Sequence, residues 1–216
     1  MAGEADATER LGGEAAANNR QGRQDSRAMV APFVVRTVAG REQFVEYLRA
    51  HIPMLVVIAD RTRNALDTFV DACRSVGDGA AVHMEDDVLL TSEFVNRIES
   101  SIRTRPAMPI QFFSMRSADM TVGSREEPGR TFLMGQCFYL PAGVSAELAR
   151  YSQRWPRRNR HPTGLDMMVA DYLAEQKQRY WIHVPCLVQH RKCKSAIDPR
   201  RASSRQSPTF ENPDAH

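Results

Sequence analysis

Cysteine is scarce in this sequence, and long hydrophobic runs are absent. The 216 residues include four cysteines at positions 73, 137, 186 and 193, too few and too widely spaced for a domain stabilised by disulfides. No apolar run approaches the roughly 20 residues needed to cross a membrane, and the first nine residues have none of the apolar stretch of a signal peptide. These absences exclude membrane-spanning and disulfide-rich classes, so we expect a cytoplasmic protein without a transmembrane segment.

The composition is that of an ordinary globular domain, with 42% hydrophobic and 25% charged residues. Between Met1 and Met29 the only large apolar residue is Leu11, so residues 1–28 cannot bury enough surface to offset the entropy of ordering. We therefore predict a disordered arm over residues 1–28, one folded domain over 29–198 and a polar tail over 199–216.

Charge is distributed unevenly along the chain. The formal net charge is +3, but the segment from Tyr151 to Arg205 holds twelve Lys and Arg against four Asp and Glu, a net charge of +8. Such asymmetry suggests a polyanionic partner, although a solvated basic surface is the commoner explanation.

Hydrophobic periodicity predicts an alternation of strands and helices. The run from Pro53 to Ala59 is continuously apolar, which is typical of a strand buried on both faces, whereas Arg63 to Val76 has helical spacing. This alternation predicts an α/β fold with a mostly parallel sheet flanked by helices. The predicted strands are 32–38, 53–59, 80–84, 109–115, 131–140 and 180–184, and the predicted helices are 41–50, 63–76, 91–102 (with Thr91 or Ser92 as cap), 143–152 and 164–176.

Three consecutive acids, Glu85, Asp86 and Asp87, follow one of the apolar strands. Because like charges this close repel, a strand end of this kind invites a compensating cation, and carboxylate oxygens suit Mg²⁺ or Mn²⁺. An acidic surface turn is the alternative. The apolar residues on both sides of the triplet favour a buried edge of the sheet and therefore a site for a metal and a diphosphate.

Four ordered motifs resemble the GT-A class of glycosyltransferases and are similar to its lipopolysaccharide-type family 25. The resemblance spans about residues 32–198 and implies a single GT-A-like, Rossmann-like domain. The motifs are Glu85-Asp86-Asp87-Val88, the stretch from Thr131 to Pro141 that contains Gly135 and Tyr139, Gly164-Leu165-Asp166, and the stretch from Pro185 to His190.

The resemblance implies roles for several of these residues. Asp87 and His190 match the metal ligands of the class, Glu85 and Asp86 lie on the nucleotide side, and Asp166 matches the catalytic base of inverting members. Asp166 also has an alternative role, because Thr163-x-x-Asp166 resembles a helix capping box. Similarly, a lone histidine such as His190 is often structural.

Further site residues are predicted from their positions in the pattern. Ligands of such sheets bind at the carboxyl ends of strands, where Arg36 and Thr37 end the first strand and Asp60 ends the second. We therefore place these three residues on the donor side, and Gly135 and Tyr139 on the acceptor side.

Together these features predict a metal-dependent glycosyltransferase. It would use Mn²⁺ or Mg²⁺ to move a sugar from a nucleotide-sugar donor to a hydroxyl of an anionic acceptor, such as a polysaccharide or hydroxymethylated DNA. The match at Asp166 favours inversion at the sugar.

Two other functions are compatible with the sequence. His183, Cys186, His190 and Cys193 are zinc-type ligands in a basic segment, which suggests a nucleic-acid-binding zinc module. A non-catalytic nucleotide-binding domain of GT-A ancestry is the other.

Overall fold

The computed structural model describes residues 31–156, 161, 163–198 and 205–211. The predicted arm at 1–28, and residues 199–204 and 212–216 of the predicted tail, lie outside the described residues.

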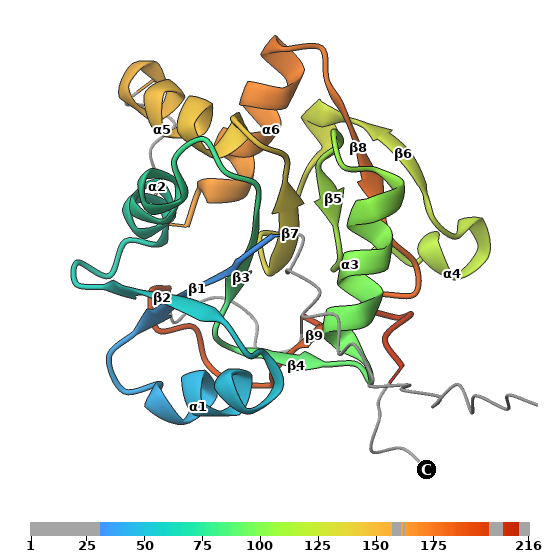
Figure 1. Cartoon of the computed structure of the whole chain (residues 1–216), viewed down its shortest axis with the longest axis horizontal. Helices are drawn as coiled ribbons and strands as arrows, with labels where there is room; N and C mark the ends of the chain where they lie inside the picture. The colour runs from blue at the N-terminus through green and yellow to red at the C-terminus, as the bar shows by residue number, and fades with distance from the viewer. Residues whose placement is uncertain (1–30, 157–160, 162, 199–204, 212–216) are drawn as a thin grey trace, which may run out of the picture.

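A mixed seven-stranded sheet runs through the molecule in the order β2-β1-β3-β7-β5-β8-β6 (Figure 1). Five of these strands point the same way, and only β7 and β6 run against them. The predicted α/β fold with a mostly parallel sheet is therefore confirmed. The strands are β1 Phe33–Val38, β2 Leu55–Asp60, β3 Ala81–Glu85, β5 Ile110–Gln111, β6 Arg125–Pro128, β7 Cys137–Leu140 and β8 Arg179–Ile182.

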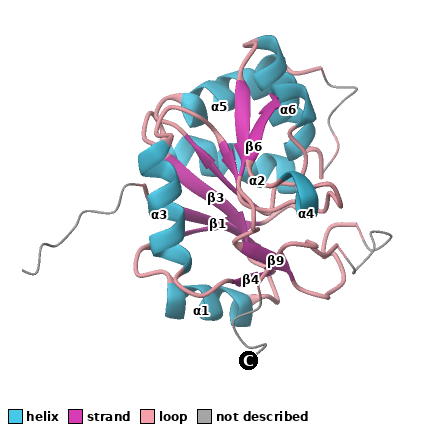
Figure 2. Cartoon of the chain, turned by 90° about the vertical axis from the view of Figure 1, so that its right-hand side faces the viewer, coloured by secondary structure: helices cyan, strands magenta, loops and turns pink. Residues whose placement is uncertain are grey.

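Helices cover both faces of the sheet (Figures 1 and 2). One core cluster joins α2, α5 and α6 to one face, and a second joins α1 and α3 to the other. The helices are α1 Glu42–His51, α2 Ala65–Val76, α3 Phe94–Thr104, α4 Asp119–Val122, α5 Val144–Arg154 and α6 Leu165–Glu175. None of the helices in the described ranges has the length and hydropathy of a membrane span.

Side chains of the central strand β7 alternate between these two core clusters, as the two-residue period of a strand requires. On β7, Phe138 and Leu140 face the first cluster, whereas Cys137 and Tyr139 face the second. Buried residues on both faces explain why this strand is apolar throughout.

Several predicted elements differ from the structure. The run from Pro53 to Ala59 forms β2, which lies at the edge of the sheet, and the side chain of Val56 is 43% exposed; the prediction of burial on both faces was wrong. Helix α3 begins after Glu93, which has φ of 52° and no capping side-chain hydrogen bond, so neither Thr91 nor Ser92 caps it.

Two strands are shorter than their apolar patterns predict. The run 109–115 pairs as a strand only at Ile110–Gln111, because beyond it Phe112 N donates to Cys137 O while Phe112 O accepts from Leu187 N. The run 131–140 enters the sheet only at Cys137. Burial in loops therefore accounts for the rest of the apolar signal.

The edge strand β6 and a second, two-stranded sheet were not predicted. Strand β6 reads Arg-Glu-Glu-Pro, which has no apolar alternation, and the second sheet pairs β4 (Val88–Leu90) with β9 (Val188–His190), only three residues each. Elements this short or this polar give no periodic signal.

A buried histidine predicts how stability depends on pH. His83 on β3 is fully buried, lies parallel to the ring of Phe138 and contacts the hydroxyl of Ser145 through Nε2 at 3.1 Å. Burial lowers the pKa of His83 to about 3, against about 6.5 in an unfolded chain. Between these values the unfolded chain binds a proton that the folded chain does not.

The free energy of unfolding should therefore fall as the pH falls below 6.5, by up to about 1.4 kcal/mol per pH unit from this group. Urea denaturation from pH 7.5 to 5 checks this, and His83→Gln should flatten the profile while His51→Gln, at an exposed histidine, should not. Parallel profiles for the protein and His83→Gln would contradict the prediction.

Candidate functional site

The parallel pairing of β1 and β3 brings their carboxyl ends together. Arg36 pairs with Glu85 in this register, and Asp86 N donates to Arg36 O at 3.1 Å. The acidic triplet therefore begins where β3 leaves the sheet, directly beside the end of β1. The chain continues into β4, so the acids are held between two elements.

Asp86 is fixed by donors from the β1–α1 segment. Thr37 Oγ1 donates to Asp86 Oδ2 at 2.6 Å, and Arg41 Nη1 contacts both Asp86 Oδ1 and Asp87 Oδ2 at 2.8 Å. One guanidinium group thus bridges two neighbouring carboxylates. The positive partner is essential to such a buried pair, because its removal would leave the two carboxylates without a compensating charge.

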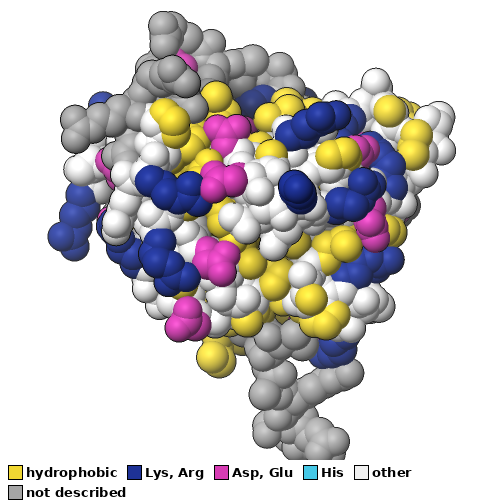
Figure 3. Space-filling model, turned by 90° about the horizontal axis from the view of Figure 1, so that it is seen from above, with side chains coloured by type: hydrophobic (Ala, Val, Ile, Leu, Met, Phe, Trp, Pro, Cys, Tyr) yellow, Lys and Arg dark blue, Asp and Glu magenta, His cyan; other side chains and the backbone are white. Residues whose placement is uncertain are grey.

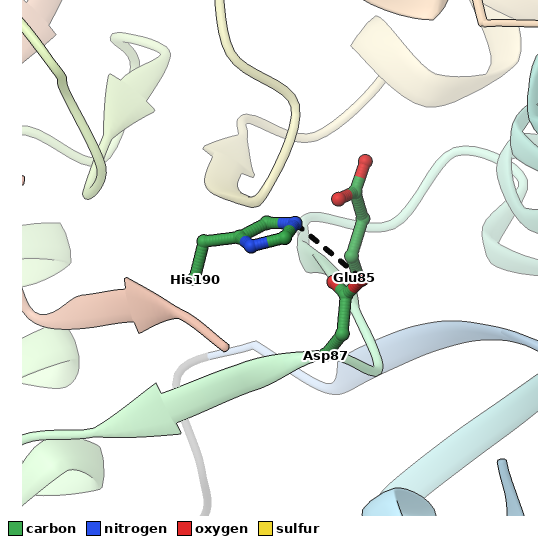
Figure 4. Close-up of side chains that lie close together, drawn as sticks. All are labelled: Glu85, Asp87 and His190. Carbon is green, nitrogen blue, oxygen red and sulfur yellow. Dashed lines mark ion pairs between the residues drawn. The ribbon is translucent and has the colours of Figure 1, made fainter. Parts of the chain in front are cut away.

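The small β4–β9 sheet brings His190 to Asp87. Val88 pairs with His190, and Arg191 N donates to Asp87 O at 2.8 Å. The Nδ1 atom of His190 lies 2.6 Å from Arg191 O, so Nδ1 is the donor and Nε2 is left to face Asp87 Oδ2 at 3.4 Å (Figure 4).

Glu85, Asp87 and His190 form a candidate metal centre. Each offers one ligand atom, and these atoms lie within 4.8 Å of one another. Among the described residues, no other group of three His, Cys, Asp or Glu side chains is gathered in this way. Asp87 Oδ1 is buried and has no hydrogen-bond partner among the described residues. Two carboxylates and an imidazole suit a divalent cation, so the residues present fit a metal, whose identity they do not determine.

The electrostatics of the cluster agree with this fit. Burial, and then the neighbouring Asp87, raises the pKa of Glu85 to about 7. Burial also raises the pKa of Asp86, although the hydrogen bond from Thr37 opposes the shift, and burial lowers the pKa of His190. Each shift disfavours the charged form and has burial as its largest cause, whereas a bound cation would favour the ionised carboxylates.

A pocket of about 220 Å³ lies beside the cluster. It brings together eight of the ten predicted site residues from β1, the end of β2, the acidic triplet, the segment before β7 and the start of α6. These residues are Arg36, Thr37, Asp60, Glu85, Asp86, Asp87, Gly135 and Asp166.

Asp166 enters the pocket from the first turn of α6. Its Oδ2 accepts from Met134 N at 3.4 Å and its Oδ1 from Met167 N at 3.0 Å. The helix N-cap is Gly164 rather than Thr163, the residue of the capping-box alternative. The carbonyl of Gly135 accepts from Arg36 Nη2, and a Cβ at this position would press on Leu165 Cδ1, so the end of that side chain would have to shift.

Tyr139 lies away from the pocket. Its side chain is 2% exposed within the core, and its hydroxyl donates to Pro106 O at 2.8 Å. The acceptor-side prediction for Tyr139 fails because residue 139 points to the α1–α3 face of β7, while the pocket is built at the end of the sheet.

The four zinc-type residues are not gathered into one site. His183 Nδ1 contacts Pro185 O, and Cys186 Sγ accepts from Ser114 N in the core. Within the described ranges, the group of possible metal ligands that contains His190 includes neither Cys186 nor Cys193. The zinc module is therefore contradicted, because His183 and Cys186 lie in the segment between β8 and β9 and contact other partners, while His190 faces Asp87.

Arg41, Gln136 and Arg205 are among the pocket residues that the sequence analysis missed. Arg205 Nη2 lies 2.6 Å from His190 Nε2, while Gln206 Nε2 donates to His190 O. Residues 205–207 thus pack along β9. The sequence offered only one signal for Arg205, which is its position in the basic segment. Its contacts depend on how the chain after residue 204 folds back onto His190, and no local pattern predicts that.

Basic residues of that segment that the structure describes are partly paired. Arg154 contacts Glu175 at 2.7 Å and Arg179 contacts Glu126 at 3.1 Å. On the face in Figure 3, Lys and Arg side chains are interspersed with Asp and Glu. The basic side chains of the described residues therefore do not form a continuous surface on this face.

Comparisons with known proteins add little. No protein-family model matches the chain, and no curated protein matches it. Among solved structures, A197 from STIV is similar with a TM-score of 0.43 and 11% sequence identity, over 74% of this chain and 85% of that chain. A likeness of this size carries no argument about activity.

The contact between Arg205 and His190 yields a prediction for metal binding. Because the guanidinium group occupies the lone pair of Nε2 and repels cations, Arg205→Gln should bind Mn²⁺ several-fold more tightly than the unaltered chain. Titration calorimetry with Mn²⁺ alone measures this. Lys192→Gln, at an exposed neighbour, is the control, and weaker binding by Arg205→Gln would show that Arg205 instead supports the site.

Proposed function

We propose that the protein is a metal-dependent glycosyltransferase of the GT-A class, which moves a sugar from a nucleotide-sugar donor to a hydroxyl group. The observation that carries the proposal is that the Glu85, Asp87 and His190 cluster borders a pocket in which a further carboxylate, Asp166, stands apart from it. A cation site and a separate carboxylate are the two parts this chemistry needs.

The metal would be held by Glu85, Asp87 and His190, and Mn²⁺ or Mg²⁺ fits these ligands. When bound, it would supply charge stabilisation for a leaving diphosphate. The protein's own donors on this side are Thr37 and Arg41, which hold Asp86 and Asp87 in place. The ends of β1 and β2, with Asp60, would then receive the nucleoside.

Asp166 would take the proton of the acceptor hydroxyl. Its two backbone hydrogen bonds fix the carboxylate at the pocket edge, and a base positioned in this way acts directly on the attacking hydroxyl. Direct attack by the acceptor corresponds to inversion at the sugar carbon.

The acceptor would be an anionic molecule, such as a polysaccharide or hydroxymethylated DNA. The support for this is the net charge of +8 from Tyr151 to Arg205. Within that segment Arg157, Arg158, Arg160, Arg200 and Arg201 lie outside the described residues.

Removal of Asp87 should abolish metal-dependent turnover. Asp87→Ala deletes a buried ligand, so we expect release of nucleoside diphosphate from a panel of nucleotide-sugars to fall by about 100-fold or more. Asp78→Ala, at an exposed acid, should turn over normally. Full activity of Asp87→Ala would refute the proposed metal site.

Asp166→Asn should separate chemistry from binding. The amide keeps the shape and can keep one of the two contacts with backbone N–H groups, but it cannot accept a proton, so kcat should fall by about 10²- to 10⁴-fold while binding of Mn²⁺ and nucleoside diphosphate persists. Asp171→Asn on the same helix serves as the matched control, since Asp171 accepts from Trp155 Nε1. Unchanged turnover in Asp166→Asn would leave Asp166 as a structural residue.

A further inference from the structure

Arg36 lies beneath the pocket, across three adjacent strands. It lies in the second half of β1 opposite Glu85 of β3, and Glu85 N in turn donates to Gln136 O at 2.9 Å, just before β7. The side chain of Arg36 reaches across β3, where Nη2 donates to Gly135 O at 2.8 Å. The rings of Phe69 and Phe138 lie 5.3 and 5.8 Å from its guanidinium carbon. The group is thus held rigidly in a mainly apolar setting.

The other terminal nitrogen of Arg36 is unsatisfied. No described residue accepts a hydrogen bond from Arg36 Nη1. Likewise, no described residue donates a hydrogen bond to Gln136 Oε1 or to Asp60 Oδ2. All three residues line the pocket, and they are only 5, 3 and 9% exposed. Buried polar atoms rarely lack partners, because each costs about 1–3 kcal/mol. Their concentration around one pocket indicates a polar ligand.

The charge of Arg36 is also poorly compensated. Burial lowers the pKa of Arg36, and the acid that most opposes this is Glu85. Glu85, however, belongs to the candidate metal cluster. A carboxylate that binds a cation is partly neutralised by it and therefore compensates the charge of a nearby guanidinium group less well. By contrast, Arg41 contacts two carboxylates at 2.8 Å.

We propose that Arg36 forms an oxyanion-binding subsite at the floor of the pocket, distinct from the metal cluster, which binds a carboxylate or phosphate group of the ligand. A guanidinium group presents donors in a planar fork that matches such oxygens. The neighbouring Gln136 Oε1 and Asp60 Oδ2 would accept from hydroxyl groups of the same ligand.

Two ligands can supply the oxyanion. One is a nucleotide-sugar whose sugar is a hexuronic acid, read through its carboxylate, an assignment that rests on the proposed glycosyltransferase function. The other is a phosphate group of any nucleotide. The subsite itself depends on neither.

The experiment measures affinity by calorimetry for UDP-glucuronic acid, UDP-glucose, UDP, free glucuronate and inorganic phosphate, with EDTA present so that no metal contributes. The variants are Arg36→Gln, Arg36→Lys and the control Arg61→Gln, at an exposed arginine. Circular dichroism and thermal melting without ligand establish that each variant is folded. A comparison of glucuronate with glucose, made on the unaltered chain alone, does not depend on whether any variant folds.

If the carboxylate is bound, UDP-glucuronic acid should bind at least tenfold more tightly than UDP-glucose, and Arg36→Gln should abolish the difference while Arg61→Gln keeps it. If a phosphate is bound, Arg36→Gln should weaken all three nucleotides by the same factor of ten or more. Arg36→Lys should lose part of the affinity, because it keeps the charge but not the fork.

Affinities in Arg36→Gln equal to those of the unaltered chain would overturn the subsite. Should Arg36→Gln not fold, equal melting temperatures of the unaltered chain in glucuronate, phosphate and glucose would do the same. Binding of free glucuronate or phosphate that depends on Arg36, without binding of any nucleotide when the titrations are repeated with Mn²⁺ in place of EDTA, would refute the glycosyltransferase proposal and leave the subsite standing.

Discussion

The site depends on the negative charge that accumulates where β3 leaves the sheet. Three consecutive acids at a buried strand end repel one another, and the structure answers with groups from separate elements. Arg41 reaches from the start of α1 to Asp86 and Asp87, and Thr37 donates from the end of β1. Even so, burial, and then the neighbouring Asp87, raises the pKa of Glu85 to about 7. A cation bound here would favour the ionised carboxylate.

The sheet provides the rigid support for this charge. Residues of β7 alternate between two core clusters, and on β3 Val82 and Met84 face one of them while the ring of His83 stacks on Phe138 of the other, so both strands are fixed by packing on both faces. The short β4–β9 sheet then extends this order beyond the main sheet and holds His190 opposite Asp87. Because site geometry follows from these packed strands, its ligands are placed with little loop freedom.

Two arginines define complementary parts of the pocket. Arg41 has its charge matched by two carboxylates, whereas Arg36 is more deeply buried and keeps one terminal nitrogen without a partner among the described residues. The first stabilises the protein's own anions, and the second is available to an anion from outside. Both arginines and two acids of the candidate metal centre, Glu85 and Asp87, line the same pocket. The pocket therefore combines groups that attract an anion with groups that attract a cation, as the proposed phosphorylated ligand with a bound cation would require.

The sequence by itself determined the α/β alternation, most of the helices and the location of the acidic triplet, because apolar periodicity and clustered charge are local properties. It also predicted eight residues that line one pocket, since strand ends in such sheets converge. The tertiary structure alone decided that Tyr139 faces the core, that His183 and Cys186 separate from His190, and that Arg205 returns to Nε2 of His190. These outcomes depend on strand register and on contacts between distant segments, which no local pattern encodes.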